Sequence, residues 1–375
     1  MRIERAELLI VQLPMVRSFT TSSSSKRHQT HVLVKLYADG LVGWGECASP
    51  SDPYYCEETT ETCWHILKDF LLPSVIGKPW TTIEELTGNY AKLKRNNFAK
   101  AGLEMACWDL LAQAAGRPLH AMLGGTRSEI LSGVSLGVEE RIEDLFALID
   151  QYVGEGYRRI KLKIAPGKDL EVLSQVRERY PDLPLMADAN SAYTLADAPR
   201  LKELDRLGLM MIEQPLAHDD IVDHATLQAQ LETPICLDES ILSVDDARKA
   251  LQLGSGRIIN IKVSRVGGLL NAKRIHDYCY ERGVPVWCGG MHEFGVGRAA
   301  NLAISSLPGY SLPGDVSGSD KYYHEDIVQP AIRASGGAIP VPNGPGLGYA
   351  VDEERVARAT LRRYERGLDR EIRES

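Results

Sequence analysis

Five ionisable residues follow one another along the middle of this chain at nearly constant intervals. Lys163, Asp188, Glu213, Asp238 and Lys262 are separated by 25, 25, 25 and 24 residues. Each of them ends a short apolar run of the kind that forms a buried strand. Because the carboxyl ends of such strands converge on one face of a barrel, we expect these side chains to share a site. There the acids could bind a divalent cation and the lysines could move protons.

The same interval predicts the elements that position this site. About 25 residues leave room for a loop, a helix and a second loop between strands, which is the repeating unit of a (β/α) barrel. We expect eight strands, near residues 131–137, 158–163, 184–188, 209–213, 234–238, 257–262, 284–288 and 310–315. Amphipathic helices are expected between them, among others at 141–154, 168–179, 195–206, 244–253 and 268–281.

The N-terminal part has a different pattern. The first 50 residues alternate as antiparallel strands do, with a hairpin turn at Ala38-Asp39-Gly40, and 57–76 and 97–115 have helical patterns. A polar stretch at 20–30 is expected to be a loop, with the potential of a lid. The expected fold class is an α/β barrel, TIM-like (β/α)7β, with an N-terminal α+β capping domain completed by the C-terminal tail. The expected domains are 1–125 (cap), 126–320 (barrel with the site) and 321–375 (C-terminal segment on barrel and cap).

Composition excludes several classes of protein. The net charge of −8 and the absence of basic runs or zinc-ligand spacing argue against nucleic acid as a partner. No apolar stretch has the length of a membrane span, so no membrane partner is expected. The seven cysteines form no CxxC pair and are odd in number, which favours reduced thiols in a cytoplasmic protein. We expect a homo-oligomer that acts on a small molecule.

The three acids together predict a metal site. Alone, Asp188, Glu213 or Asp238 would more often be a helix cap or a surface group. Three carboxylates at consecutive strand ends would repel one another strongly unless a cation compensated them. Carboxylate oxygens are ligands of hard cations, so the expected cofactor is Mg²⁺, for which Mn²⁺ or another divalent ion could substitute.

The lysines predict acid–base chemistry on two faces of a substrate. Lys161 and Lys163 alternate with Leu162, so both should point into the barrel. A lone lysine is usually a surface residue, but two inward-facing ones should lower each other's pKa and favour a neutral amine. Lys262 ends the sixth expected strand and should face Lys163 on the second. This layout suits abstraction of a proton α to a substrate carboxylate through an enediolate that the cation and ammonium groups stabilise.

Several motifs resemble a known family. The segments KLKIAPGKD, ADAN, IEQPL, CLDES, INIKVSRVGG, VWCGGMHEFGVGRAAN and LPGDVSGS resemble the o-succinylbenzoate synthase/N-succinylamino acid racemase group, in the muconate-lactonizing branch of the enolase superfamily. GWGECASP and AGLEMACWDLLAQAAGRPLHAMLGG resemble the capping domain of that group, so the resemblance covers most of the chain.

The resemblance implies a role for individual residues. It implies Asp188, Glu213 and Asp238 as Mg²⁺ ligands, Lys163 and Lys262 as the acid/base pair, and Lys161 as an electrostatic auxiliary. Ser135, Asn190, Arg265, Met291 and His292 would contact the substrate, and Arg265 is linked in the group with racemase-competent members. The implied activity is racemisation of N-succinyl amino acids, dehydration to o-succinylbenzoate, or both.

The chain departs from the group in two regions that help to define its substrate pocket. His292 stands where members commonly have Leu, Phe294 stands where they have Ser or Thr, and Ser22 to Ser25 replace a loop that often contains Phe and Gly. Phe294 should add bulk to the pocket beside His292. An imidazole in an apolar pocket should meet a polar atom of the substrate, the capping loop or a water. Lys262 already occupies the sixth strand, so His292 is not expected to be the base.

Alternatives remain open within and outside the superfamily. A cycloisomerase or a dipeptide epimerase would use the same pair of lysines. Dipeptide epimerases typically carry Asp-x-Asp where this chain has Asp315-Val316-Ser317, with one acid missing. A non-catalytic, ligand-binding barrel would require the loss of a metal ligand or a lysine, and none is lost.

Overall fold

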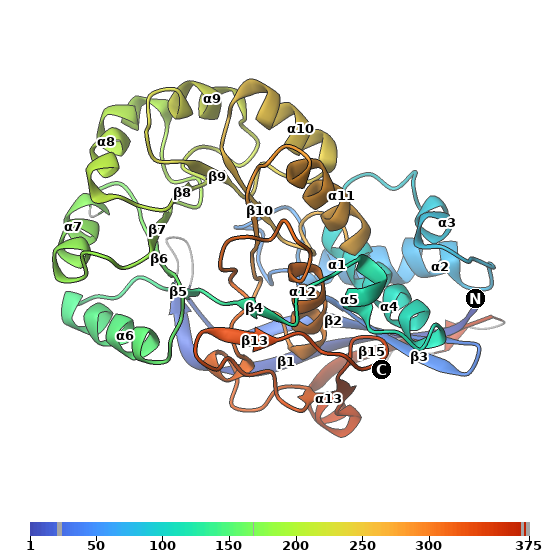
Figure 1. Ribbon diagram of the computed structural model, residues 1–375. Helices are drawn as coiled ribbons and strands as arrows, with labels where there is room; N and C mark the ends of the chain where they lie inside the picture. The colour runs from blue at the N-terminus through green and yellow to red at the C-terminus, as the bar shows by residue number, and fades with distance from the viewer. Residues whose placement is uncertain (21–24, 168, 369–370, 373–375) are drawn as a thin grey trace.

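A computed structural model of the protein describes residues 1–20, 25–167, 169–368 and 371–372. Figure 1 shows a ring of helices around a curled parallel sheet, with a second, antiparallel sheet beside it. The parallel sheet has the order β11-β10-β9-β8-β7-β6-β5 and the antiparallel sheet the order β16-β15-β1-β2-β3. The second order brings the two ends of the chain into one sheet. The expected α/β barrel with a cap that the C-terminal tail completes is therefore confirmed.

The parallel sheet carries the residues of the predicted site. Its strands are β5 (Val134–Leu136), β6 (Ile160–Lys163), β7 (Leu185–Asp188), β8 (Ile212–Glu213), β9 (Ile235–Leu237), β10 (Ile258–Ile261) and β11 (Val286–Cys288). These are seven of the eight strands that the spacing predicts, each somewhat shorter than expected. Neighbours pair in parallel, with Lys163 opposite Asp188 and Asp188 opposite Glu213. The register thus sets these three side chains side by side at one edge.

The eighth predicted strand, 310–315, is wrong as a continuous strand. Within the described residues this segment makes only isolated parallel bridges, Val286 with Tyr310 and Ser132 with Gly314. Pro313, in the middle of this segment, lacks the backbone N–H that a ladder needs, which explains the interruption. The two bridges nevertheless close the barrel. Tyr310 pairs with Val286 on β11, and Gly314 pairs with Ser132, which lies just before β5.

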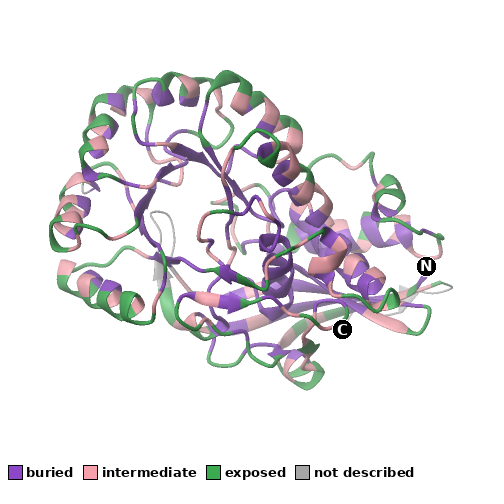
Figure 2. Ribbon diagram, in the orientation of Figure 1, coloured by how far each residue is buried: buried purple, intermediate pink, exposed green. Residues whose placement is uncertain are grey.

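Helices cover the outside of the barrel. They are α6 (Ile142–Gly154), α7 (Asp169–Arg179), α8 (Ala198–Lys202), α9 (Val222–Gln228), α10 (Val244–Leu253), α11 (Leu269–Tyr280) and α12 (Gly295–Ser305). Four of the predicted helices are confirmed. The fifth, at 195–206, is divided into the 3-10 turn η2 (Leu195–Asp197), α8 and the 3-10 turn η3 (Glu203–Leu207). Figure 2 shows that the strands are buried and that helices such as α6 and α7 are exposed on their outer faces. Helix α12 differs, because it contacts both β11 of the barrel and β3 of the cap and all its residues are buried.

Below the site, the interior of the barrel is filled by packed side chains. Met186, Met211, Cys236, Ile258 and Trp287 form a separate buried cluster with exposed fractions of 5 % or less. They come from strands β7, β9, β10 and β11 and from the segment before β8. The barrel is therefore a packed core with a site at one end rather than a pore.

The cap consists of the antiparallel sheet and a helical layer. Its strands are β1 (Ile3–Thr20), β2 (Ser25–Ala38), β3 (Leu41–Cys47), β15 (Thr360–Gly367) and β16 (Glu371–Ile372). Its helical elements are α1 (Thr60–Ile66), the π-helical turn η1 (Leu67–Leu71), α2 (Leu72–Val75), α3 (Ile83–Gly88) and α4 (Asn97–Ala114). The two predicted helices are confirmed. The hairpin is also confirmed, because Ala38 pairs with Leu41 around Asp39 and Gly40, both at positive φ.

The polar stretch at 20–30 differs from the prediction. β1 continues to Thr20 and β2 begins at Ser25, with Phe19 opposite Lys26, so 25–30 are strand rather than loop. The long pairing with β1 provides backbone hydrogen bonds that a polar composition does not reveal. Ser22 to Ser24 lie outside the described residues.

Shorter elements connect these parts. They are α5 (Leu119–Leu123), β4 (Glu129–Leu131), the 3-10 turn η4 (Ser319–Lys321), β12 (Val328–Gln329), β13 (Ala338–Pro340), β14 (Ala350–Val351) and α13 (Glu353–Ala359). All seven cysteines are free. Across the residues described, no helix combines the length and the apolar character needed to cross a membrane.

Two buried carboxylates of the cap bind the barrel. Glu46 on β3 accepts the N–H groups of Phe294 and Gly297 at the start of α12. Glu104 on α4 accepts the N–H groups of Leu269 and Leu270 at the start of α11. A carboxylate at a helix N-terminus satisfies donors that have no partner within the helix. These contacts hold the cap in place over the barrel.

Candidate active site

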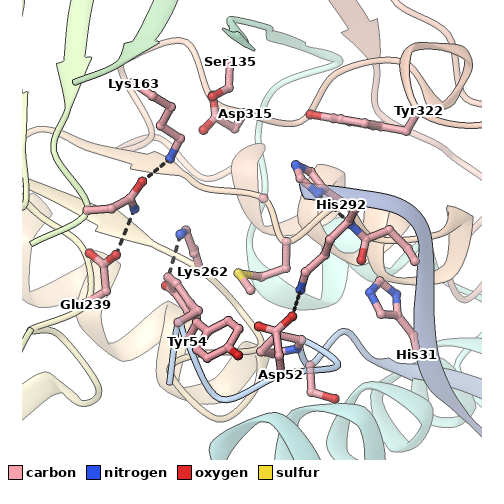
Figure 3. Close-up of a pocket in the computed structure, with 18 of the residues that line it drawn as sticks. His31, Asp52, Tyr54, Ser135, Lys163, Glu239, Lys262, His292, Asp315 and Tyr322 are labelled. Atoms are coloured by element: carbon pink, nitrogen blue, oxygen red, sulfur yellow. Dashed lines mark hydrogen bonds and ion pairs between the residues drawn. The ribbon is translucent and has the colours of Figure 1, made fainter. Parts of the chain in front are cut away.

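A cavity of about 280 Å³ lies where the cap meets the ends of the barrel strands. Seven of the residues predicted for the site line it, namely Ser135, Lys161, Lys163, Asn190, Lys262, Met291 and His292. The cap contributes Lys26, Gln29, His31, Asp52, Tyr54 and Tyr55 to the same wall. Figure 3 shows Lys163, Lys262, His31, Asp52 and His292 arranged around this one space.

The three predicted metal ligands lie under the wall rather than on it. The side chains of Asp188, Glu213 and Asp238 are at most 1 % exposed. The Lys161 ammonium lies 2.9 Å from an oxygen of Asp188 and 2.6 Å from an oxygen of Glu213. We call these three carboxylates and the lysines that contact them the floor of the cavity.

Asp238 has two cationic neighbours. Lys262 Nζ donates to its Oδ2 at 2.7 Å, and the Arg265 guanidinium contacts its Oδ1. Arg265 is 2 % exposed, does not line the cavity, and donates to the carbonyl oxygens of Ile241 and Asn260. As the side chains lie, Arg265 reaches Asp238 rather than open space, so its predicted contact with substrate stays a prediction.

The carboxylate oxygens of the floor are the donors that a divalent cation would use. As placed, no three His, Cys, Asp or Glu side chains in the described part of the chain are grouped closely enough to hold a metal ion. However, Glu213 Oε2 and Asp238 Oδ1 are buried and accept no hydrogen bond, although each faces a cationic side chain. An all-carboxylate donor set with free lone pairs suits Mg²⁺, so the residues fit the predicted ion. The ligand assignment itself stays a prediction.

The charged groups of the floor interact strongly and shift one another's pKa values. Burial acts to lower the pKa of Lys161, but the carboxylates of Asp188, Asp315 and Glu213 outweigh it and raise that pKa above its ordinary value. Burial likewise opposes the effect of Lys161 and Lys163 on Asp188, whose pKa is nevertheless lowered. The expected mutual lowering of the lysine pKa values is therefore wrong for Lys161 in this arrangement, because the nearby acids have the larger effect.

Lys163 and Lys262 reach the cavity from different sides of the barrel. Lys163 ends β6, Lys262 follows β10, and three strands separate these two in the sheet. Lys163 Nζ donates to Asp188 at 2.6 Å and to Asn190 at 2.5 Å. Lys262 Nζ donates to the Tyr55 hydroxyl of the cap at 3.1 Å. Each amine is thus positioned by a polar neighbour in addition to its carboxylate.

Strained backbone marks the loops that follow the strand ends. Asn190, Ser191, Gln214 and His292 have φ values of 43°, 63°, 37° and 59°. Residues other than glycine adopt this region at a cost that is often found at functional sites. Asn190 uses its position to connect two groups on the wall, because it accepts from Lys163 and donates to Glu239 at 3.1 Å.

His292 meets a polar atom of the cap, as its chemistry predicts. Its Nδ1 lies 3.0 Å from Nε2 of Gln29 on β2, and since an amide nitrogen only donates, Nδ1 is the acceptor. Burial lowers the pKa of His292 well below its ordinary value, so the imidazole is neutral. The expectation that Phe294 adds bulk to the pocket is wrong. Phe294 is fully buried between His31 and Tyr323, at the start of α12.

Several wall residues were not predicted from the sequence. Glu239 follows Asp238 in the CLDES motif, and this adjacency was a usable signal. Tyr55 and the ion pair between Lys26 and Asp52 come from the cap. Nothing in the sequence around these residues predicts that they line the site. Asp315 also lines the wall, where it pairs with Arg159 at 2.8 Å and with Lys161 at 3.2 Å.

Comparison with known proteins identifies the family. Residues 5–124 match the N-terminal domain of the mandelate racemase/muconate lactonizing enzyme family, and residues 144–355 match the enolase C-terminal domain-like family. An o-succinylbenzoate synthase of Geobacillus kaustophilus is 56 % identical over 96 % of both chains. An N-succinylamino acid racemase of Thermus thermophilus is 48 % identical over 96 % of this chain and 98 % of that protein.

Solved structures agree with these matches. The crystal structure of an enolase superfamily member from Listeria innocua superposes with a TM-score of 0.95 at 42 % identity, covering 98 % of this chain and 100 % of that one. A muconate lactonizing enzyme from Pseudomonas fluorescens gives a TM-score of 0.91 at 26 % identity, covering 96 % and 99 %. The chain therefore belongs to the mandelate racemase/muconate lactonizing enzyme family of the enolase superfamily, and it is an enzyme that abstracts a proton α to a carboxylate.

Proposed function

We propose that this enzyme racemises N-succinyl amino acids and dehydrates the precursor of o-succinylbenzoate at the same site. The observation that supports it best is the placement of Lys163 and Lys262, on different sides of one cavity above three buried carboxylates. Relatives that carry either name are similar over nearly the whole chain. Both reactions begin with the loss of a proton next to a carboxylate.

The floor would supply the electrostatic part of catalysis. Asp188, Glu213 and Asp238 would hold Mg²⁺, or Mn²⁺ in its place, which when bound makes the α-proton of a coordinated carboxylate more acidic. Lys161 pairs with Asp188 and Glu213 and would stabilise the negative charge of the enediolate rather than move a proton.

The two lysines would divide the work differently in the two reactions. Racemisation requires one lysine to remove the proton from one face and the other to return it on the opposite face. A dehydration in which both groups leave from one face needs a base on that face alone. The second lysine would then serve as a cation beside the enediolate.

Two other lysine-pair activities are less well supported. A dipeptide epimerase needs a carboxylate for the substrate ammonium group, but Asp315 is already paired with Arg159 and Lys161. Cycloisomerase is the name of more distant relatives, such as a chloromuconate cycloisomerase at 28 % identity. We therefore place these activities behind the racemase and the synthase.

The test is a direct measurement of proton exchange and turnover. The purified enzyme with Mg²⁺ is incubated in D₂O with an N-succinyl-L-amino acid, and the α-proton is followed by NMR while optical rotation reports racemisation. Formation of o-succinylbenzoate is measured in parallel by absorbance. We expect both reactions, with racemisation the more efficient. Absence of exchange with every substrate would overturn the proposal and favour a non-catalytic, ligand-binding barrel.

A further inference from the structure

The lysines on the floor of the cavity and the lysine on its cap side differ in how closely they are paired with carboxylates. On the floor, Lys161, Lys163 and Lys262 each have a carboxylate oxygen within 2.6 to 2.7 Å. Their positive charge is compensated, and their roles lie at the reacting carbon. None of these three lysines can serve a second, distant anion of the substrate without leaving the floor.

The cap carries a cation that the reaction does not use. Among the described residues that line the cavity, Lys26 is the lysine outside the floor. It lies near the start of β2, and its Nζ pairs with Oδ2 of Asp52 at 3.0 Å, a contact drawn at Asp52 in Figure 3. The two side chains are 20 % and 27 % exposed. An ion pair between such partly exposed groups is weak and open to exchange with another anion.

The two substrates of the proposed function share a second anion. Each has a carboxylate beside the reacting carbon and a succinyl group that ends in another carboxylate. The reacting carbon must lie between Lys163 and Lys262, and its carboxylate must face the floor. The remainder of the substrate then has the cap side of the cavity, which is lined by Lys26, Gln29 and His31.

We propose that Lys26 binds the terminal carboxylate of the succinyl group and that this carboxylate displaces Asp52. The proposal rests on the proposed function and adds the residue that recognises the acyl group. A substrate carboxylate in place of Asp52 keeps the Lys26 ammonium paired, whereas a neutral acyl group leaves the Lys26–Asp52 pair intact and gains nothing from it. One subsite in the cap would then serve both the racemase and the synthase reaction, since the succinyl group is common to them.

The experiment compares two acyl groups on the same amino acid. Values of kcat/KM for racemisation of N-succinyl and N-acetyl substrates are measured, and their ratio is the readout. In Lys26→Met we expect the ratio to fall about tenfold, mainly through KM for the succinyl substrate, since a charge-assisted hydrogen bond is lost. Lys26→Arg should keep most of the ratio. Asp52→Asn should raise it, because the competing carboxylate is gone.

Arg27 provides the matched control. It is the next residue on β2, it is exposed, and it does not line the cavity, so Arg27→Met should leave both activities and their ratio unchanged. An unchanged ratio in Lys26→Met, an equal loss on both substrates, or a fall in Asp52→Asn would overturn the subsite. If the wild-type enzyme exchanges the α-proton of the succinyl substrate but Lys26→Met has the wild-type ratio, the subsite is refuted and the proposed function stands. A wild type that exchanges neither substrate refutes the proposed function together with it.

Discussion

The floor and the cap side of the cavity differ in the burial of their charged side chains and in the length of their ion-pair contacts. Floor side chains are almost completely buried, project from the ends of barrel strands, and contact oppositely charged partners at 2.6 to 2.9 Å. On the cap side, Lys26 and Asp52 are partly exposed and contact each other at 3.0 Å. Groups on strands with buried partners are held rigidly, whereas partly exposed pairs exchange easily. The difference supports our proposal that the barrel residues carry out the reaction and that the cap selects the substrate.

The two zones are nevertheless mechanically connected. Lys262 donates to Tyr55, Gln29 contacts His292, and Glu46 links His31 to the first turn of α12. Each contact joins a cap residue to a barrel residue or helix end next to the cavity. A change in cap position would therefore reach the floor.

The largest effect is expected from the two lysines. Lys163→Ala and Lys262→Ala should each lower racemisation by about 10³-fold or more, because each removes the acid or base on one face. Metal binding and the fold should persist. Lys202→Ala, an exposed lysine on α8, serves as the control and should be neutral. Racemisation near the wild-type rate in both directions in either variant would exclude the two-base assignment.

Removal of one floor carboxylate should come next. Asp238→Asn should weaken Mg²⁺ binding and cost about 3 kcal/mol of transition-state stabilisation, roughly 100-fold in kcat/KM, because a metal ligand charge is lost. Activity is titrated against Mg²⁺ concentration in both proteins. Asp182→Asn, in an exposed loop, is the control. Wild-type activity that survives complete removal of divalent ions would rule out the metal role.

Loss of a cap–barrel contact should affect stability rather than chemistry. Glu46→Ala leaves two buried N–H groups of α12 and the His31 imidazole without their acceptor, which should cost about 2 to 4 kcal/mol of unfolding free energy. Chemical denaturation measures the change, with the exposed Glu178→Ala on α7 as the control. A cost below about 0.5 kcal/mol, the usual size for a surface change, would mean that Glu46 does not hold the cap.

The smallest effect is expected at His292. In His292→Leu the amide of Gln29 loses its acceptor, and the racemase-to-synthase ratio of kcat/KM should change about three- to tenfold toward the synthase. A substrate panel on wild type, His292→Leu, Gln29→Leu and the double variant measures the coupling of the pair. If the ranking of substrates by kcat/KM is unchanged, or if the wild type is already as efficient as a dedicated synthase, His292 only packs and does not determine specificity.

The predictions from sequence were most successful where the determinants are local. A constant interval of about 25 residues was enough to place Lys163, Asp188 and Glu213 at adjacent strand ends, because each unit of the barrel repeats the same local structure. The alternation around Leu162 was enough to point Lys161 into the barrel. The eighth predicted strand is wrong as a continuous strand, because its apolar residues favour a strand whereas Pro313 cannot donate to a ladder.

The sequence by itself thus determined the barrel, its cap and the order of charged residues along the strand ends. Only the tertiary structure decided what the cap presents to the site. Gln29 and His292 are 263 residues apart, and Glu46 and Gly297 are 251 apart. The turn of Phe294 into the core and the pairing of Lys26 with Asp52 beside the cavity likewise depend on how the cap docks. No periodicity encodes such contacts, because they join residues far apart in the sequence where the surfaces of cap and barrel meet. We expect the selectivity of this enzyme to lie there.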